Sequence, residues 1–187
     1  SLANETGVSH TTAREWISIL EASYVIFQLP PWYANISKRL IKTPKIYFWD
    51  VGLAAYLLGL EEEKQVSRDP LRGNLFENMV VAEMFKQYYH YGKRPRLSFY
   101  RDSSGNEVDL VLERGQDLFP IEIKSGQTVS KQFFQGLNRF SGVVGDRIKR
   151  GVVVYAGESK QLRSDWETWP VKELGEVFKG TSGLFAN

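Results

Sequence analysis

Two β-rich segments, residues 107–113 and 118–124, constrain the fold of this chain more than any other feature. They alternate apolar and charged side chains, and a short polar turn that contains Gly115 separates them. This pattern predicts an antiparallel β-hairpin. In the register that such a turn favours, Asp109 stands directly opposite Glu122.

The same alternation sorts the other side chains of the hairpin onto two faces. Lys124 falls on the face of the two carboxylates, and Glu107 stands opposite it across the hairpin. The opposite face is expected to be apolar and to hold Val108, Leu110, Leu112, Ile121 and Ile123. An exposed hairpin with a Glu107–Lys124 ion pair is the ordinary structural alternative.

Opposed carboxylates indicate a bound cation. Two of them about 5 Å apart repel each other and destabilise a bare hairpin unless positive charge lies between them. The chain has no cysteine and two histidines, so we expect oxygen ligands rather than sulfur or imidazole. Mg²⁺ or Mn²⁺ is the expected ion.

A third acid precedes the hairpin, in a segment that reads as a helix over residues 73–90. Val81, Met84 and Tyr88 follow Glu77 at helical spacing. Glu77 therefore lies on an apolar stripe, where a carboxylate needs a partner.

We expect these four residues to divide the chemistry of phosphodiester hydrolysis. Asp109 and Glu122 would bind the metal, and Glu77 would complete its ligand shell or hold a metal-bound water. Lys124 would orient the attacking water or stabilise the charge that builds on the phosphate.

The surrounding elements predict an α/β (α+β) core over residues 73–156 with a mixed central sheet. In chain order we expect a helix at 73–90, strands at 97–101, 107–113 and 118–124, a helix at 129–140 and a strand at 151–156.

The first 49 residues read as two helices separated by a turn at Gly7, followed by two β-rich runs. This order is typical of a winged helix. The expected wing carries four cations and no acid, namely Lys38, Arg39, Lys42 and Lys45. Because the net charge is only +2, this local cluster is what favours contact with DNA phosphates. Winged helices also serve as protein-interaction modules, so that alternative stays open.

The charged segment 61–72 marks the expected boundary between a winged-helix domain, 1–60, and a second domain, 61–187. The first domain is expected to be truncated at its N-terminus, because the chain opens inside a helical motif. No apolar run is long enough for a membrane helix. We therefore expect no membrane partner and a cytoplasmic location.

The core motifs resemble those of the PD-(D/E)XK nuclease superfamily. The resemblance runs through Leu75-Phe76-Glu77, Asn106-Glu107-Val108-Asp109 and Ile121-Glu122-Ile123-Lys124. Val108 stands where the superfamily's name has proline. The resemblance implies an αβββαβ core with the four site residues above as its centre, and DNA as substrate.

Nearly the whole chain is also similar to the C-terminal half of a group of bacterial and archaeal AAA-type ATPases, in which a winged helix and a nuclease-like domain of unknown function follow the ATPase domain. The residues that carry this likeness are Leu20-Glu21-Ala22-Ser23-Tyr24, Asn35-Ile36-Ser37-Lys38-Arg39-Leu40, Lys42-Thr43-Pro44-Lys45, Tyr47-Phe48-Trp49-Asp50-Val51-Gly52-Leu53 and Arg72-Gly73-Asn74-Leu75-Phe76-Glu77. No phosphate-binding loop of the G-x-x-x-x-G-K-[ST] type occurs here. ATP would therefore bind only to an N-terminal part outside these 187 residues.

Three functions fit these observations. The first is a divalent-metal-dependent DNA endonuclease positioned by an ATPase. The second is a catalytically inactive nuclease fold that binds DNA or protein in the service of that ATPase. The third is a purely structural oligomerisation region.

Overall fold

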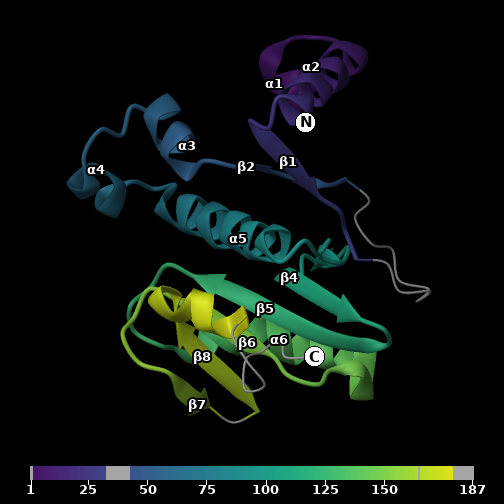
Figure 1. Cartoon of the computed structure of the whole chain (residues 1–187), viewed down its shortest axis with the longest axis vertical. Helices are drawn as coiled ribbons and strands as arrows, with labels where there is room; N and C mark the ends of the chain where they lie inside the picture. Colours follow the sequence, from purple (N-terminus) through teal and green to yellow (C-terminus); the bar gives the residue numbers. More distant parts are fainter. Residues whose placement is uncertain (1, 33–42, 164, 179–187) are drawn as a thin grey trace.

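The computed structural model describes residues 2–32, 43–163 and 165–178, and its N-terminal part consists of two helices and a β-hairpin (Figure 1). These elements are α1 (Leu2–Thr6), α2 (His10–Ala22), β1 (Ile26–Leu29) and β2 (Lys45–Phe48). The Ser9 side chain accepts a hydrogen bond from the Thr12 N–H at 3.0 Å and so caps α2. The two strands are antiparallel. Two helices followed by a hairpin is the order that the sequence predicts.

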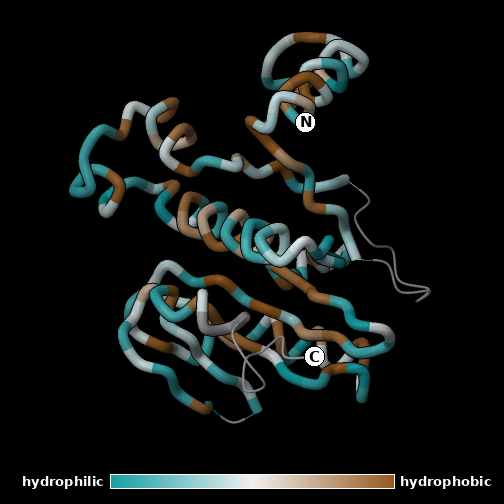
Figure 2. Tube along the Cα trace, in the orientation of Figure 1, coloured by the Kyte–Doolittle hydropathy of each residue, from teal (hydrophilic) through white to brown (hydrophobic). Residues whose placement is uncertain are grey.

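Two short helices, α3 (Val51–Leu57) and α4 (Glu63–Arg68), lead from the hairpin into the long helix α5 (Arg72–His90). α4 lies within the charged segment that the sequence marks as a boundary, and Figure 2 shows it as largely hydrophilic. None of the helices in the described parts of the chain has the length and apolar character that crossing a lipid bilayer requires.

A mixed sheet follows α5, with the strand order β3-β4-β5-β6-β8-β7. Its strands are β3 (Leu97–Arg101), β4 (Glu107–Arg114), β5 (Asp117–Lys124), β6 (Val152–Tyr155), β7 (Gln161–Arg163) and β8 (Trp166–Pro170). β3, β4 and β5 are antiparallel, whereas β5, β6 and β8 run parallel. Helix, three strands, helix and strand therefore succeed one another from α5 to β6, which confirms the predicted α+β class.

The parallel pairing of β5 with β6 requires a crossover connection, and α6 (Gln135–Val144) supplies it. The sequence places this helix at 129–140. The structure instead has a short 3₁₀ turn, η1 (Lys131–Phe134), before α6, and the helix extends further to η2 (Gly145–Arg147). Another 3₁₀ segment, η3 (Val171–Phe178), follows the sheet.

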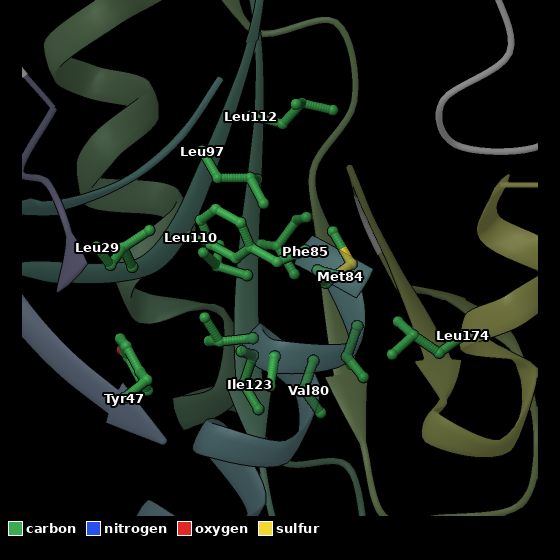
Figure 3. Packing of buried hydrophobic residues seen from close by; sticks show 14 of the residues in the cluster. Leu29, Tyr47, Val80, Met84, Phe85, Leu97, Leu110, Leu112, Ile123 and Leu174 are labelled. Atoms are coloured by element: carbon green, nitrogen blue, oxygen red, sulfur yellow. The ribbon is translucent and has the colours of Figure 1, made fainter. Parts of the chain in front are cut away.

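Each face of the sheet packs against its own helix. On one face, Val80 and Met84 of α5 pack with Leu110 and Ile123 (Figure 3). On the other face, two buried residues of α6 join a second cluster, which also holds Val108, Val111, Val153 and Tyr155. Of the predicted site residues, Glu77 and Asp109 line a cavity on the α5 side, and Glu122 lies against α6.

The N-terminal hairpin shares the core of the α5 layer. Leu29 of β1 and Tyr47 of β2 belong to the same buried cluster as Val80 (Figure 3). Beyond β1, the Trp32 N–H donates to the Phe99 carbonyl at 2.6 Å. The division into domains 1–60 and 61–187 stays a prediction, and apolar contacts cross it.

A β-bulge interrupts β4 at the end of the β4–β5 pair that carries Asp109. The register of β3 with β4 shifts between Ser98 and Tyr100, so that Asp109 and Leu110 together oppose the single residue Phe99. Val108 therefore packs in the α6 cluster, and its predicted place beside Leu110 is wrong. An extra residue in one strand reverses the alternation beyond it, which a strict period of two cannot anticipate.

Candidate functional site

Asp109, Glu122 and Lys124 lie together at one end of the β4–β5 pair. Both carboxylates are buried, with 8% of Asp109 and 4% of Glu122 exposed. The Lys124 Nζ lies 2.9 Å from Glu122 Oε2 and 3.6 Å from Asp109 Oδ2. We call Asp109 and Glu122 the carboxylate pair, and the ammonium of Lys124 contacts both.

The bulge turns Asp109 toward β5. The predicted β4–β5 register holds from Arg114–Asp117 to Leu110–Ile121. One step further, the Asp109 carboxylate accepts the Ile123 N–H at 2.8 Å. The side chain thus satisfies a backbone donor at the point where the regular ladder ends.

The surroundings of Glu122 favour its protonated form. The pKa of Glu122 is raised to about 9, mainly by burial and also by the charge of Asp109 and a hydrogen bond to it, while Lys124 opposes the rise. Glu122 is therefore protonated at neutral pH, and the proton neutralises one of two carboxylates that would otherwise repel each other.

Gly136 of α6 allows the helix to pack directly over this pair. A Cβ at this position would overlap the Glu122 carboxylate and the Glu107 carbonyl oxygen. Only glycine fits between them, because any side chain would displace either the acid or the helix. The sequence offers no signal of this role, since glycine within a helix is usually only a weak point.

Glu77 lies in a different environment, on the α5 side. The Lys45 Nζ is 2.9 Å from Glu77 Oε1, and the Tyr47 hydroxyl donates to the same oxygen at 2.6 Å. Lys45 also forms an ion pair with Glu107 Oε1, and Arg101 Nη2 lies 2.6 Å from the other oxygen of that carboxylate. We call Lys45, Tyr47, Glu77, Arg101 and Glu107 the hairpin cluster, because β2 of the N-terminal hairpin supplies its central cation.

The electrostatics of the hairpin cluster fix its protonation. Burial opposes the charged form of Lys45, but the negative charges of Glu77, Asp109 and Glu107 outweigh it and raise the pKa of this lysine. Burial and the charge of Glu77 also raise the pKa of Tyr47. Lys45 is thus a permanent cation here and Tyr47 a neutral hydrogen-bond donor.

Asn78 attaches the hairpin to α5 beside this cluster. Its side chain accepts the Phe48 N–H and donates to the Phe48 carbonyl, each at 2.8 Å. β2 is thereby held next to Glu77, which precedes Asn78 by one residue.

Glu77 and Asp109 line one cavity of about 630 Å³, which lies between β2, α3, α5 and the start of β4. Glu122 lies instead against α6. Across the described ranges, no group of three or more Asp, Glu or His side chains is placed to hold a metal ion. The structure therefore brings Asp109, Glu122 and Lys124 together and leaves Glu77 bound to Lys45 and Tyr47.

The predicted basic wing is described only in part. Lys38, Arg39 and Lys42 lie outside the described residues. Lys45, also predicted to contact DNA, has a side chain that is 17% exposed and sits between two glutamates. Its contact with DNA stays a prediction, and its position in the hairpin cluster is what sequence reasoning missed. The alternation Lys45-Ile46-Tyr47 predicts only that the amine and the hydroxyl share one face of β2, not which acids they meet.

Comparison with known proteins gives two family matches. The profile of a family described as "Domain of unknown function (DUF4143)" matches residues 72–174, and one described as "Domain of unknown function (DUF8612)" matches residues 1–64.

Two curated relatives are each 33% identical over 164 residues, which is 88% of this chain and 35% of their own length. They are "Uncharacterized protein Rv2008c" of Mycobacterium tuberculosis strain H37Rv and "Uncharacterized protein Mb2031c" of Mycobacterium bovis. The chain thus spans about a third of the length of the curated relatives it matches.

Proposed function

This chain belongs to the DUF4143 family, and from the geometry of its site we propose that it is a divalent-metal-dependent nuclease module that hydrolyses phosphodiester bonds in DNA. One observation carries the proposal. Two buried carboxylates from neighbouring strands lie within reach of one lysine ammonium, 2.9 Å from Glu122 and 3.6 Å from Asp109, and a hydrogen bond links the two acids. A buried acid pair is costly to keep, so it is more often found where chemistry needs it.

The donor set suits a hard divalent cation. Mg²⁺ and Mn²⁺ prefer carboxylate oxygens, and Asp109 and Glu122 supply them from adjacent backbones that the β-sheet holds in place. When bound, the cation would polarise the phosphate and lower the pKa of a coordinated water. The charge of Asp109 raises the pKa of Glu122, so positive charge beside the two carboxylates would be favourable.

The protein residues around that place would do the remaining work. Asp109 and Glu122 would hold the metal, and Glu122 would give up its proton as it does so. The ammonium of Lys124 would orient the attacking water or stabilise the growing negative charge on the phosphate. Glu77 would reach the same cation through the cavity that it lines with Asp109.

DNA as substrate and an AAA-type ATPase as partner are further parts of the proposal. DNA is supported by the motif resemblance around Glu77, Asp109 and Glu122, and the ATPase by the likeness of segments such as Tyr47–Leu53 and Arg72–Glu77. ATP would bind only to the ATPase part. The curated relatives extend well beyond the matched region, since it covers 35% of their length. A cytoplasmic location would follow from DNA as substrate.

The test is cleavage of plasmid and branched DNA with Mn²⁺ or Mg²⁺. We expect Glu122→Gln to reduce cleavage at least about a hundredfold, because an amide is a poor ligand for a hard cation. The control is Glu83→Gln, which removes a half-exposed carboxylate of α5 that pairs with Lys86. Cleavage that survives Glu122→Gln unchanged contradicts the proposal.

The second candidate function is a non-catalytic region that binds DNA or protein for the ATPase. It is favoured by the lack of a three-acid metal group among the described residues, together with the cations that already neutralise Glu77 and Glu107. This function predicts DNA binding that weakens with salt but does not respond to Mn²⁺ or to Asp109→Asn.

A further inference from the structure

Lys45 occupies a position in which an ammonium stands between two carboxylates from different elements. It forms ion pairs with Glu77 of α5 and Glu107 of β4. A third acid that lines the same cavity, Asp109, is near enough to raise the pKa of the Lys45 amine. A lysine from the N-terminal hairpin is thus the resident cation on the α5 side of the proposed metal site.

The hairpin that carries Lys45 is held in place by its neighbours. Tyr47 binds the same Glu77 oxygen, and Asn78 forms two hydrogen bonds to the backbone of Phe48. These contacts hold the part of β2 that follows Lys45 against α5. Because the hairpin and α5 are separate elements, a shift of β2 along α5 would part Lys45 from Glu77, at the cost of hairpin contacts with the core.

An ammonium and a divalent metal ion compete for the same oxygens. Mg²⁺ and Mn²⁺ need several carboxylate or water oxygens at about 2 Å, and Glu77 Oε1 already accepts from both Lys45 and Tyr47. An ion pair with little exposure to water also exchanges its partner less readily than a surface pair.

We propose that Lys45 is an internal cation that withholds Glu77 and Glu107 from the metal, so that the N-terminal hairpin regulates metal loading of the nuclease site. This inference rests on the proposed function, because it assumes that Asp109 and Glu122 bind a divalent cation. With Lys45 in place, the metal has two carboxylates. With Lys45 withdrawn, the metal could also reach Glu77 and Glu107, which line the same cavity as Asp109.

The experiment is a titration of the whole chain with Mn²⁺, with the free ion followed by electron paramagnetic resonance. Lys45→Gln removes the charge and keeps an amide donor for Glu77. We expect it to bind Mn²⁺ at least about tenfold more tightly than the wild type. Lys45→Arg keeps the charge and is expected to match the wild type. The matched control is Lys86→Gln, which breaks a Lys–Glu pair on the surface of α5 and is also expected to bind like the wild type.

A double substitution tests whether the freed acid is responsible. Lys45→Gln combined with Glu77→Gln is expected to lose most of the gain, because the oxygens that Lys45 releases are then missing. If Lys45→Gln does not fold, Lys45→Met replaces it, because methionine keeps most of the apolar stem. Mn²⁺ is then expected to raise the melting temperature of Lys45→Met more than that of the wild type.

The outcomes separate this inference from the proposed function. Wild-type protein that binds Mn²⁺ through Asp109, with no tighter binding in Lys45→Gln, overturns the inference and leaves the metal site standing. No Mn²⁺ binding in either protein overturns both. Tighter binding in Lys45→Gln without any DNA cleavage supports the inference and overturns the nuclease proposal.

Discussion

The hairpin cluster and the carboxylate pair stabilise poorly exposed acids in two different ways. In the hairpin cluster, cations from β2 and β3 neutralise Glu77 and Glu107. In the carboxylate pair, both acids contact Lys124, and the pKa of Glu122 is raised to about 9. The acids of the hairpin cluster have cations of the protein as partners, whereas the proton on Glu122 is lost as pH rises. The carboxylate pair is therefore the half of the site in which a metal ion could replace the proton on Glu122.

The largest expected effect is on the pH dependence of stability. Glu122 has a pKa of about 9 in the folded protein, against an ordinary value of 4.5. Between these two values the folded chain holds a proton that the unfolded chain lacks. The free energy of unfolding should therefore fall as pH rises from about 5 to 9, by on the order of a few kcal/mol. Urea unfolding at pH 6 and pH 9 measures it.

Glu122→Gln isolates the source of this slope. The amide cannot ionise, so the variant should lose much less stability between pH 6 and pH 9 than the wild type does. Glu83→Gln, on the surface of α5, should keep the wild-type slope. Equal slopes in the wild type and Glu122→Gln would show that the carboxylate pair does not hold a proton.

A substitution in α6 should disturb the carboxylate pair directly. A Cβ at Gly136 would overlap the Glu122 carboxylate and a backbone oxygen, so Gly136→Ala is expected to destabilise the fold by about 2–3 kcal/mol. Gly142 lies in the same helix with nothing within 4 Å of an added Cβ. Gly142→Ala should stabilise by about 0.5–1 kcal/mol. Similar unfolding midpoints for the two variants would refute this difference.

Much of the carboxylate pair could be predicted from the sequence because local rules determine it. The turn at Gly115 sets the β4–β5 register, and that register brings Asp109 near Glu122. The spacing of Glu122 and Lys124 in one strand puts both on one face. The helical stripe likewise indicates that Glu77 is partly buried and needs a partner.

The hairpin cluster could not be predicted in this way because it depends on contacts between distant segments. Nothing near Lys45 in the sequence indicates that it meets Glu77 of α5, 32 residues later. The bulge at Asp109 and the close approach of Gly136 also arise from how layers pack. A basic residue in an acid-free segment suggests DNA contact, whereas the fold gives Lys45 two acidic partners.

A smaller effect is expected where the hairpin is attached to α5. Asn78→Ala removes two hydrogen bonds to the backbone of Phe48 and leaves both groups without these partners. We expect a loss of about 1–2 kcal/mol in the free energy of unfolding. Asn74→Ala, at an exposed position one turn earlier in α5, should change it by less than about 0.5 kcal/mol. A larger loss in Asn74→Ala would show that β2 is held by other contacts.

The smallest effect should come from Arg101, which pairs with the same glutamate as Lys45 but from the surface. Its side chain is 36% exposed, against 17% for Lys45. Water and salt screen the exposed pair, so Arg101→Gln is expected to destabilise by less than about 1 kcal/mol. Lys45→Gln should cost more than about 2 kcal/mol, because it leaves two acids short of a buried cation. Urea unfolding of both variants at low and high salt compares them. If Arg101→Gln were as damaging as Lys45→Gln, burial would not be what distinguishes the two cations, and the special position of Lys45 would be lost.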